Sequence, residues 1–172
     1  MYGSSVNETD WEDRISAAWA AFDELTEADF LALIEKLAAE LPPGRSGIGY
    51  FERASSLDST GHDDMAVPLY RQALEHGLEG ERRRQAVIQL ASSLRNIGRP
   101  EESAVLLGAE IDAGSDDLDD AVLAFLALAL VDTGREREAV SVALAALAPH
   151  LPRYQRSVAA YARLLVEPGT GS

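Results

Sequence analysis

Between residues 80 and 97 the sequence has helical periodicity and places a row of polar side chains on one side of the predicted helix. At 100° per residue, four amide or hydroxyl side chains fall within an arc of about 60°. Such groups both donate and accept hydrogen bonds, which suits the binding of an extended peptide backbone. Arg95 borders the row and can hold a carboxylate. The four residues are Gln85, Gln89, Ser92 and Asn96. The same row also fits the plain solvated face that every amphipathic surface helix needs.

Three consecutive arginines, residues 82–84, stand near the start of the same helix. Positive charge there opposes the helix macrodipole, so a nearby negative charge is needed to offset it. Glu79 and Glu81 are adjacent in sequence, and the acidic N-terminal part of the chain is a second source. An anionic ligand is the alternative to this intramolecular pairing.

Metal-binding or catalytic residue types are scarce and poorly arranged. His62, Asp63 and Asp64 are consecutive on a predicted turn, so they cannot converge on one ion from opposite sides. The sequence contains no zinc-protease motif, phosphate-binding glycine loop or nucleophile elbow. We therefore predict no catalytic residues, no cofactor and no bound metal. A concealed active site or small-ligand sensor stays open, and a deep pocket between Phe51, Gln89 and Phe125 would favour it.

The composition excludes some partners. Among 172 residues, 29 acidic and 15 basic side chains give a net charge of −14. Nucleic acids and anionic membranes require a basic face, so neither is an expected partner. The longest apolar run, residues 121–131, is too short to span a bilayer. The sequence has no cysteine and does not start like a signal peptide, which predicts a cytoplasmic location.

One turn recurs three times along the chain. Gly61, Gly98 and Gly134 each follow the end of one predicted helix and precede another. Glycine ends a helix at little cost because it adopts positive φ readily. Each glycine therefore marks the turn of a helical hairpin. The predicted helices cover residues 9–23, 26–41, 46–60, 63–77, 80–97, 99–113, 117–133, 135–148 and 153–167.

A small residue recurs on both sides of each turn. Two helices approach closely only where side chains are small, so each such pair marks a crossing. The upstream segments are Tyr50-x-x-Arg53-Ala54-x-x-Leu57, Val87-x-x-Leu90-Ala91-x-x-Leu94 and Leu123-x-x-Leu126-Ala127-x-x-Leu130, and their downstream counterparts are Ala66, Ser103 and Ala139. This pattern resembles the tetratricopeptide repeat, in particular small bacterial tetratricopeptide proteins. The family's tryptophan position is occupied by Tyr50, Val87 and Leu123.

The resemblance implies an all-α fold, a right-handed α-solenoid of antiparallel helical hairpins. We expect a single domain over residues 1–172. Residues 1–44 would form a degenerate N-terminal hairpin, residues 45–151 three repeats, and residues 152–167 a capping helix. In such arrays the first helix of each hairpin lines a concave groove.

The resemblance places the polar row in that groove, next to side chains of the neighbouring first helices. Phe51 and Phe125 can act as apolar anchors for a bound segment, or they can belong to the core. The predicted partner-binding residues are Gln85, Gln89, Ser92, Arg95, Asn96, Phe51 and Ser55.

The resemblance therefore predicts a non-catalytic scaffold that binds a protein or peptide segment in the groove. An alternative comes from the third repeat, whose two helices, 121–131 and 140–148, are apolar on nearly all faces. A helix without a polar face must be covered. The predicted capping helix can cover part of it, and the remainder can pair with a second copy to form a structural homodimer.

Overall fold

In the computed structural model, residues 8–167 are described, and every regular element among them is helical. The predicted all-α fold is confirmed, and most helix bounds agree with the prediction to within a few residues. The α-helices are α1 (Glu8–Ala20), α2 (Glu27–Ala39), α3 (Ser46–Ser59), α4 (Asp63–Glu75), α5 (Gly80–Asn96), α6 (Pro100–Ala113), α7 (Asp119–Asp132), α8 (Glu136–Leu147) and α9 (Gln155–Leu164). Short 3-10 helices cover Phe22–Glu24 (η1), Pro43–Arg45 (η2) and Ala148–His150 (η3).

The helices form two compact units that divide between Ser93 and Leu94, inside α5. The first unit contains α1 to α4 and most of α5. The second contains the end of α5 and the helices α6 to α9. The single domain expected from the sequence remains a proposal, and each unit is described by itself.

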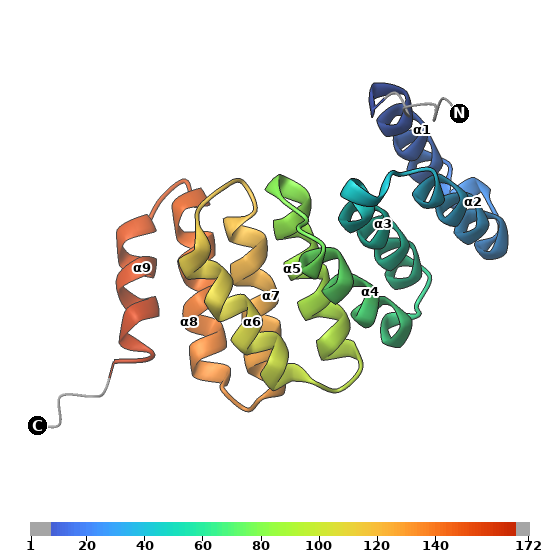
Figure 1. Cartoon of the computed structure of the whole chain (residues 1–172). Helices are drawn as coiled ribbons and strands as arrows, with labels where there is room; N and C mark the ends of the chain where they lie inside the picture. Colours follow the sequence, from blue (N-terminus) through green and yellow to red (C-terminus); the bar gives the residue numbers. More distant parts are fainter. Residues whose placement is uncertain (1–7, 168–172) are drawn as a thin grey trace, which may run out of the picture. The chain divides into compact units, whose positions relative to one another are not determined.

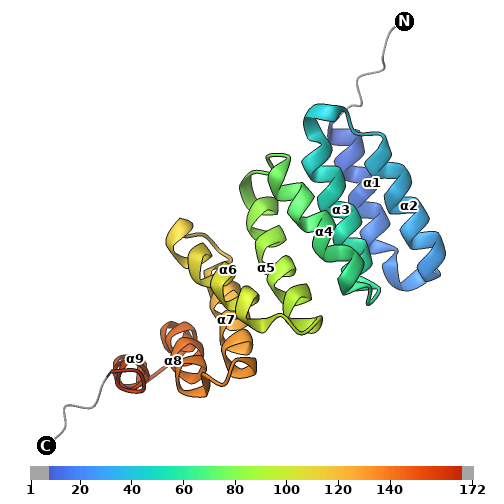
Figure 2. The same cartoon turned by 60° about the horizontal axis from the view of Figure 1, so that its bottom comes forward.

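In the first unit, α1 packs on α2, α2 on α3, and α3 on α4 (Figures 1 and 2). The α1–α2 hairpin closes around Trp11, Ile15, Phe30 and Ile34, each at most 2% exposed. The indole of Trp11 donates a 2.8 Å hydrogen bond to the Leu37 carbonyl, so its polar edge is satisfied within the core. The N-terminal hairpin is therefore well packed despite its divergent sequence.

The contact between α3 and the end of α4 depends on a glycine. A Cβ on Gly47 would lie 3.1 Å from the carbonyl oxygens of Ala73 and His76 and 3.2 Å from the Leu78 nitrogen. These are backbone atoms, which cannot turn aside as a flexible side chain can. Gly47 thus lets the two helices approach.

In the second unit, α7 packs on both α6 and α8, and α9 packs on α8 and η3. Figures 1 and 2 both show α9 beside α8, on the side away from α7. The Ser141 hydroxyl donates to the Ala162 carbonyl at 2.7 Å, and Arg137 Nε donates to the Leu165 carbonyl at 3.1 Å. The last helix is thereby fixed to α8.

The small residues singled out in the sequence are all buried. Ala54 and Ala91 have no exposed surface, and Ala127 is 9% exposed. Their counterparts Ala66, Ser103 and Ala139 are at most 2% exposed. All six residues thus have the burial that the predicted hairpin crossings require.

The recurring turn has one geometry at all three positions. Gly61, Gly98 and Gly134 have φ values of +84°, +80° and +74°. In each turn, the amide after the glycine donates to the carbonyl of the leucine five residues earlier; these leucines are Leu57, Leu94 and Leu130. This is the Schellman arrangement, which satisfies carbonyls that a helix end leaves without partners. The glycine recurs because this turn needs a residue with positive φ at the helix end.

Among residues 8–167, no helix is long and apolar enough to cross a membrane.

Candidate peptide-binding groove

A pocket of about 290 Å³ lies in the first unit, between α1, α3 and α5. These are the first helices of three successive hairpins, the elements that the family resemblance expects to line a groove. Its lining residues are Ile15, Ser16, Trp19, Phe51, Glu52, Ser55, Ser59, Arg82, Gln85 and Gln89. The pocket therefore combines apolar and aromatic surface with hydroxyl, amide and charged groups.

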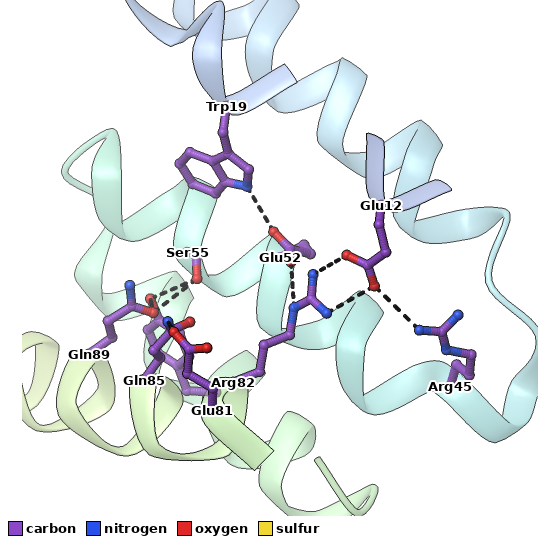
Figure 3. Close-up of polar contacts among 10 residues, drawn as sticks. Glu12, Trp19, Arg45, Glu52, Ser55, Glu81, Arg82, Gln85 and Gln89 are labelled. Atoms are coloured by element: carbon purple, nitrogen blue, oxygen red, sulfur yellow. Dashed lines mark hydrogen bonds and ion pairs between the residues drawn. The ribbon is translucent and has the colours of Figure 1, made fainter. Parts of the chain in front are cut away.

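A buried carboxylate stands in this pocket. Glu52 is 3% exposed and accepts a 2.8 Å hydrogen bond from the indole of Trp19 (Figure 3). Arg82 Nε donates to its other oxygen at 3.3 Å. Burial raises the pKa of Glu52, because removal from water disfavours the charged form more than Trp19 and Arg82 favour it. Glu52 is thus an unusually costly residue to keep charged.

Arg82 forms its shorter hydrogen bonds with a different carboxylate. Its two terminal nitrogens donate to the carboxylate of Glu12 at 3.0 and 2.5 Å (Figure 3). Arg45 reaches the same carboxylate at 3.4 Å. The hydrogen bond from Arg82 is the main reason that the pKa of Glu12 is lowered. The pairing of the arginine run with the acidic N-terminal hairpin is thereby confirmed for Arg82.

A second polar network borders the pocket on α5. The Ser55 hydroxyl donates to Gln89 Oε1 at 3.0 Å, and the Tyr70 hydroxyl lies 3.1 Å from both Gln89 Oε1 and Asp58 Oδ2. Burial and a hydrogen bond with Asp63 raise the pKa of Asp58 to about 6. Gln89 is therefore held in place by buried neighbours.

A second pocket, of about 580 Å³, adjoins the first at the start of α5. The two share Arg82 and Gln85 in their linings. Arg45, His76 and Glu79 are among the other residues around the second pocket. The two pockets therefore lie next to each other in the first unit, on either side of Arg82 and Gln85.

Four of the seven predicted binding residues line the first pocket: Gln85, Gln89, Phe51 and Ser55. Phe51 is 5% exposed and packs near Tyr70, with ring centroids 6.4 Å apart, so it contributes to the core as well as to the pocket wall.

The other three predicted residues, Ser92, Arg95 and Asn96, lie farther along α5 and are not part of this pocket's described lining. Arg95 forms a 2.5 Å ion pair with Asp132, so its charge is already compensated within the second unit.

The sequence reasoning missed Trp19, Glu52 and Ser16. Periodicity predicts only that Trp19 lies on the apolar face of its helix, and it does not distinguish Glu52 from a surface glutamate. A glutamate next to Phe51 on a helix with small and apolar neighbours was the available signal. Glu12 was likewise not predicted as part of the site, although it binds both Arg82 and Arg45.

Within the described part of the chain, no group of three or more histidine, aspartate and glutamate side chains could hold a metal ion. Around the pocket the charged groups are bound to one another, and the hydroxyl of Ser55 donates to an amide rather than to a base. The arrangement is suited to hydrogen bonding and to the burial of an apolar side chain.

Comparison with known proteins agrees with this architecture. A model of the tetratricopeptide repeat family matches residues 47–165, which is more than half of the chain. No curated protein and no solved structure matches significantly.

Proposed function

Because the chain belongs to the tetratricopeptide repeat family, whose repeats generally mediate protein–protein interactions, we propose that it is a non-catalytic scaffold that binds a protein segment in the groove of its first unit. The observation that carries the proposal is the pocket of about 290 Å³ between α1, α3 and α5, in which polar and apolar groups converge. We also place this scaffold in the cytoplasm, since a chain without cysteine suits a reducing compartment.

The dimensions of the first pocket favour a peptide side chain over a complete small molecule. Pockets that enclose small ligands typically measure about 300–1,000 Å³. This pocket, at about 290 Å³, lies just below that range, and a second pocket adjoins it at Arg82 and Gln85. An extended segment can insert one apolar side chain beside Trp19 and lay its backbone along the amides of α5. Gln85 and Gln89 supply hydrogen-bonding groups for that backbone.

The charge of the first unit favours a basic segment. Residues 1–93 contain 17 acidic and 8 basic side chains, a net charge of −9. A field of this sign attracts a positively charged partner and accelerates its association. The proposed ligand is therefore an extended, basic protein segment with at least one large apolar side chain.

A random peptide library displayed on phage tests the proposal. Peptides selected on the wild type would be measured by fluorescence anisotropy against Ser16→Arg, which places a long cationic side chain in the pocket. Ala17→Arg is the matched control, because Ala17 is exposed on the same helix and does not line the pocket. We expect at least a tenfold loss of affinity for Ser16→Arg and little change for Ala17→Arg. Equal binding to both variants, or selection of no peptide, would remove the groove from the proposal.

A further inference from the structure

The well-exposed large apolar side chains of this protein are concentrated in its second unit. Among the described residues, Met65 is the only exposed large apolar side chain in the first unit. On α7 and α8, four such side chains are about half exposed: Leu128 at 46%, Val131 at 49%, Val140 at 48% and Leu147 at 49%. A contiguous apolar surface of this kind marks an interaction site rather than ordinary protein surface.

Three of these side chains border a groove of about 440 Å³ between α7 and α8. Alanines make up the rest of its lining, including Ala124, Ala143 and Ala146. The surface thus carries large side chains and small ones side by side. It can therefore pair with a copy of itself, because the projecting side chains of one copy fit over the alanines of the other.

The helix α9 leaves this groove open. It is held by Arg137 and Ser141, which lie about 40° apart around α8 at 100° per residue. Val140 and Ala143 point well away from that direction, toward the groove. The expected capping helix therefore covers a different side of α8, and no described residue of the second unit covers the apolar surface between α7 and α8.

Several charged residues of α7 and α8 are paired within the chain. Asp132 pairs with Arg95 at 2.5 Å, and Asp120 with His150 at 2.7 Å. Arg135 binds both carboxylate oxygens of Glu138. The groove lining itself contains no charged residue. Its occupant must match an uncharged, apolar surface, which the same surface of a second copy does.

The exposed apolar area fits a weak dimer. The exposed halves of Leu128, Val131 and Val140, the three large side chains that border the groove, amount to roughly 200 Å² of apolar surface per copy. Two copies would bury roughly 400 Å² in this way, and the alanines add to this. A small specific interface buries about 1,200 Å² in total, of which about 56–65% is apolar.

We propose that two copies of this chain associate isologously through the α7–α8 groove, with Leu128, Val131 and Val140 of each copy packed over the alanines of the other. The dimer is weak, with a dissociation constant on the order of 10 µM, as befits an interface at the lower limit of specific contacts. Because each chain carries a charge of −14, added salt strengthens the association by screening the repulsion between copies.

Sedimentation equilibrium on the full chain, from about 1 to 200 µM, tests the proposal. We expect the wild-type mass to rise from monomer to dimer and the dissociation constant to fall several-fold between low and high salt. Leu128→Glu and Val140→Glu should each remain monomeric with an unchanged circular dichroism spectrum. Val105→Glu is the matched control, since Val105 is 74% exposed on α6 and lies outside the groove, and it should dimerise like the wild type.

Cysteine crosslinking provides a second measurement that does not depend on a disruptive substitution. The sequence has no cysteine, so a single introduced one can form a disulfide only between copies. Ala124→Cys, Leu128→Cys and Ala143→Cys sample the groove, and Val105→Cys is the control. Crosslinking at a groove position alone supports the interface. A wild type that stays monomeric throughout, or a dimer that survives both glutamate variants, overturns it.

Discussion

Replacement of Arg82 by methionine should destabilise the first unit by leaving a buried carboxylate without its cationic neighbour. Methionine keeps much of the length and apolar surface of the arginine and removes its charge. Glu52, 3% exposed, would retain only the hydrogen bond from Trp19. Removing one partner of a buried ion pair costs about 3–5 kcal/mol. Because Arg82 is 29% exposed and water screens part of this interaction, we expect about 3 kcal/mol, including the loss of the contact with Glu12.

Urea denaturation followed by tryptophan fluorescence measures this loss where it occurs. The chain has two tryptophans, Trp11 and Trp19, and both lie in α1. Their emission therefore reports unfolding of the first unit rather than the second. A loss of about 3 kcal/mol corresponds to a fall of roughly 1–3 M in the urea midpoint.

A double-mutant cycle separates the buried charge from the lost packing. Glu52→Gln keeps an acceptor for Trp19 and removes the charge that Arg82 offsets. We expect the Glu52→Gln change to restore the Arg82→Met variant to within about 1 kcal/mol of the wild type. If Arg82→Met is as stable as the wild type, or if Glu52→Gln fails to rescue it, the account of this network is wrong.

The pH dependence of the stability of the same variants tests the Arg82–Glu52 interaction independently. The folded-state pKa of Glu52 is raised above 4.5, so its contribution to stability is greatest below pH 4.5 and is lost as the pH rises through the folded value. Without Arg82 this loss should be larger. The stability gap between Arg82→Met and the wild type should therefore narrow below pH 4.5. Glu12 narrows the gap in the same direction, because Arg82 lowers its pKa and this stabilisation of the wild type is lost as the pH falls.

Two further predictions concern the packing and the titration of the first unit. Gly47→Ala should cost about 1–3 kcal/mol in urea denaturation, because its Cβ would lie 3.1 Å from two backbone oxygens, whereas Gly44→Ala, with no neighbour within 4 Å, should cost little. Equal effects of the two would contradict the close approach of α3 and α4. Asp58→Asn should remove a pH-dependent loss of stability: the folded pKa of about 6 exceeds the unfolded 3.8, so the wild type loses this contribution as the pH rises through 6. Parallel stability profiles for Asp58→Asn and the wild type between pH 4 and 7.5 would refute this.

The helical hairpins could be predicted because their determinants are local. A small residue at a crossing and a glycine at a helix end are required by steric contacts within one hairpin, so they recur at fixed offsets. Ala54 is completely buried, and Gly61 adopts a φ of +84°, as those requirements demand.

The ion-pair network could be foreseen only in outline. Glu12 and Arg82 are 70 residues apart, and Trp19 and Glu52 are 33 apart. Periodicity within one helix assigns a face to each of these side chains, but it does not say which residue of another helix stands opposite. An excess of acid in residues 1–44 and three adjacent arginines at 82–84 indicated that charges would meet, without identifying the pair.

The same limitation explains why the predicted binding row was only partly recovered in the pocket. A helical wheel shows that Gln85, Gln89, Ser92 and Asn96 share a face, but it contains no information on position along the helix axis. Neighbouring helices meet α5 over part of its length, where Trp19 and Ser55 reach it, so only Gln85 and Gln89 line that pocket. A face is a property of one helix, whereas a pocket needs several. Variants chosen on the shared face alone, such as a change at Asn96, would consequently probe a different surface from changes at Gln85.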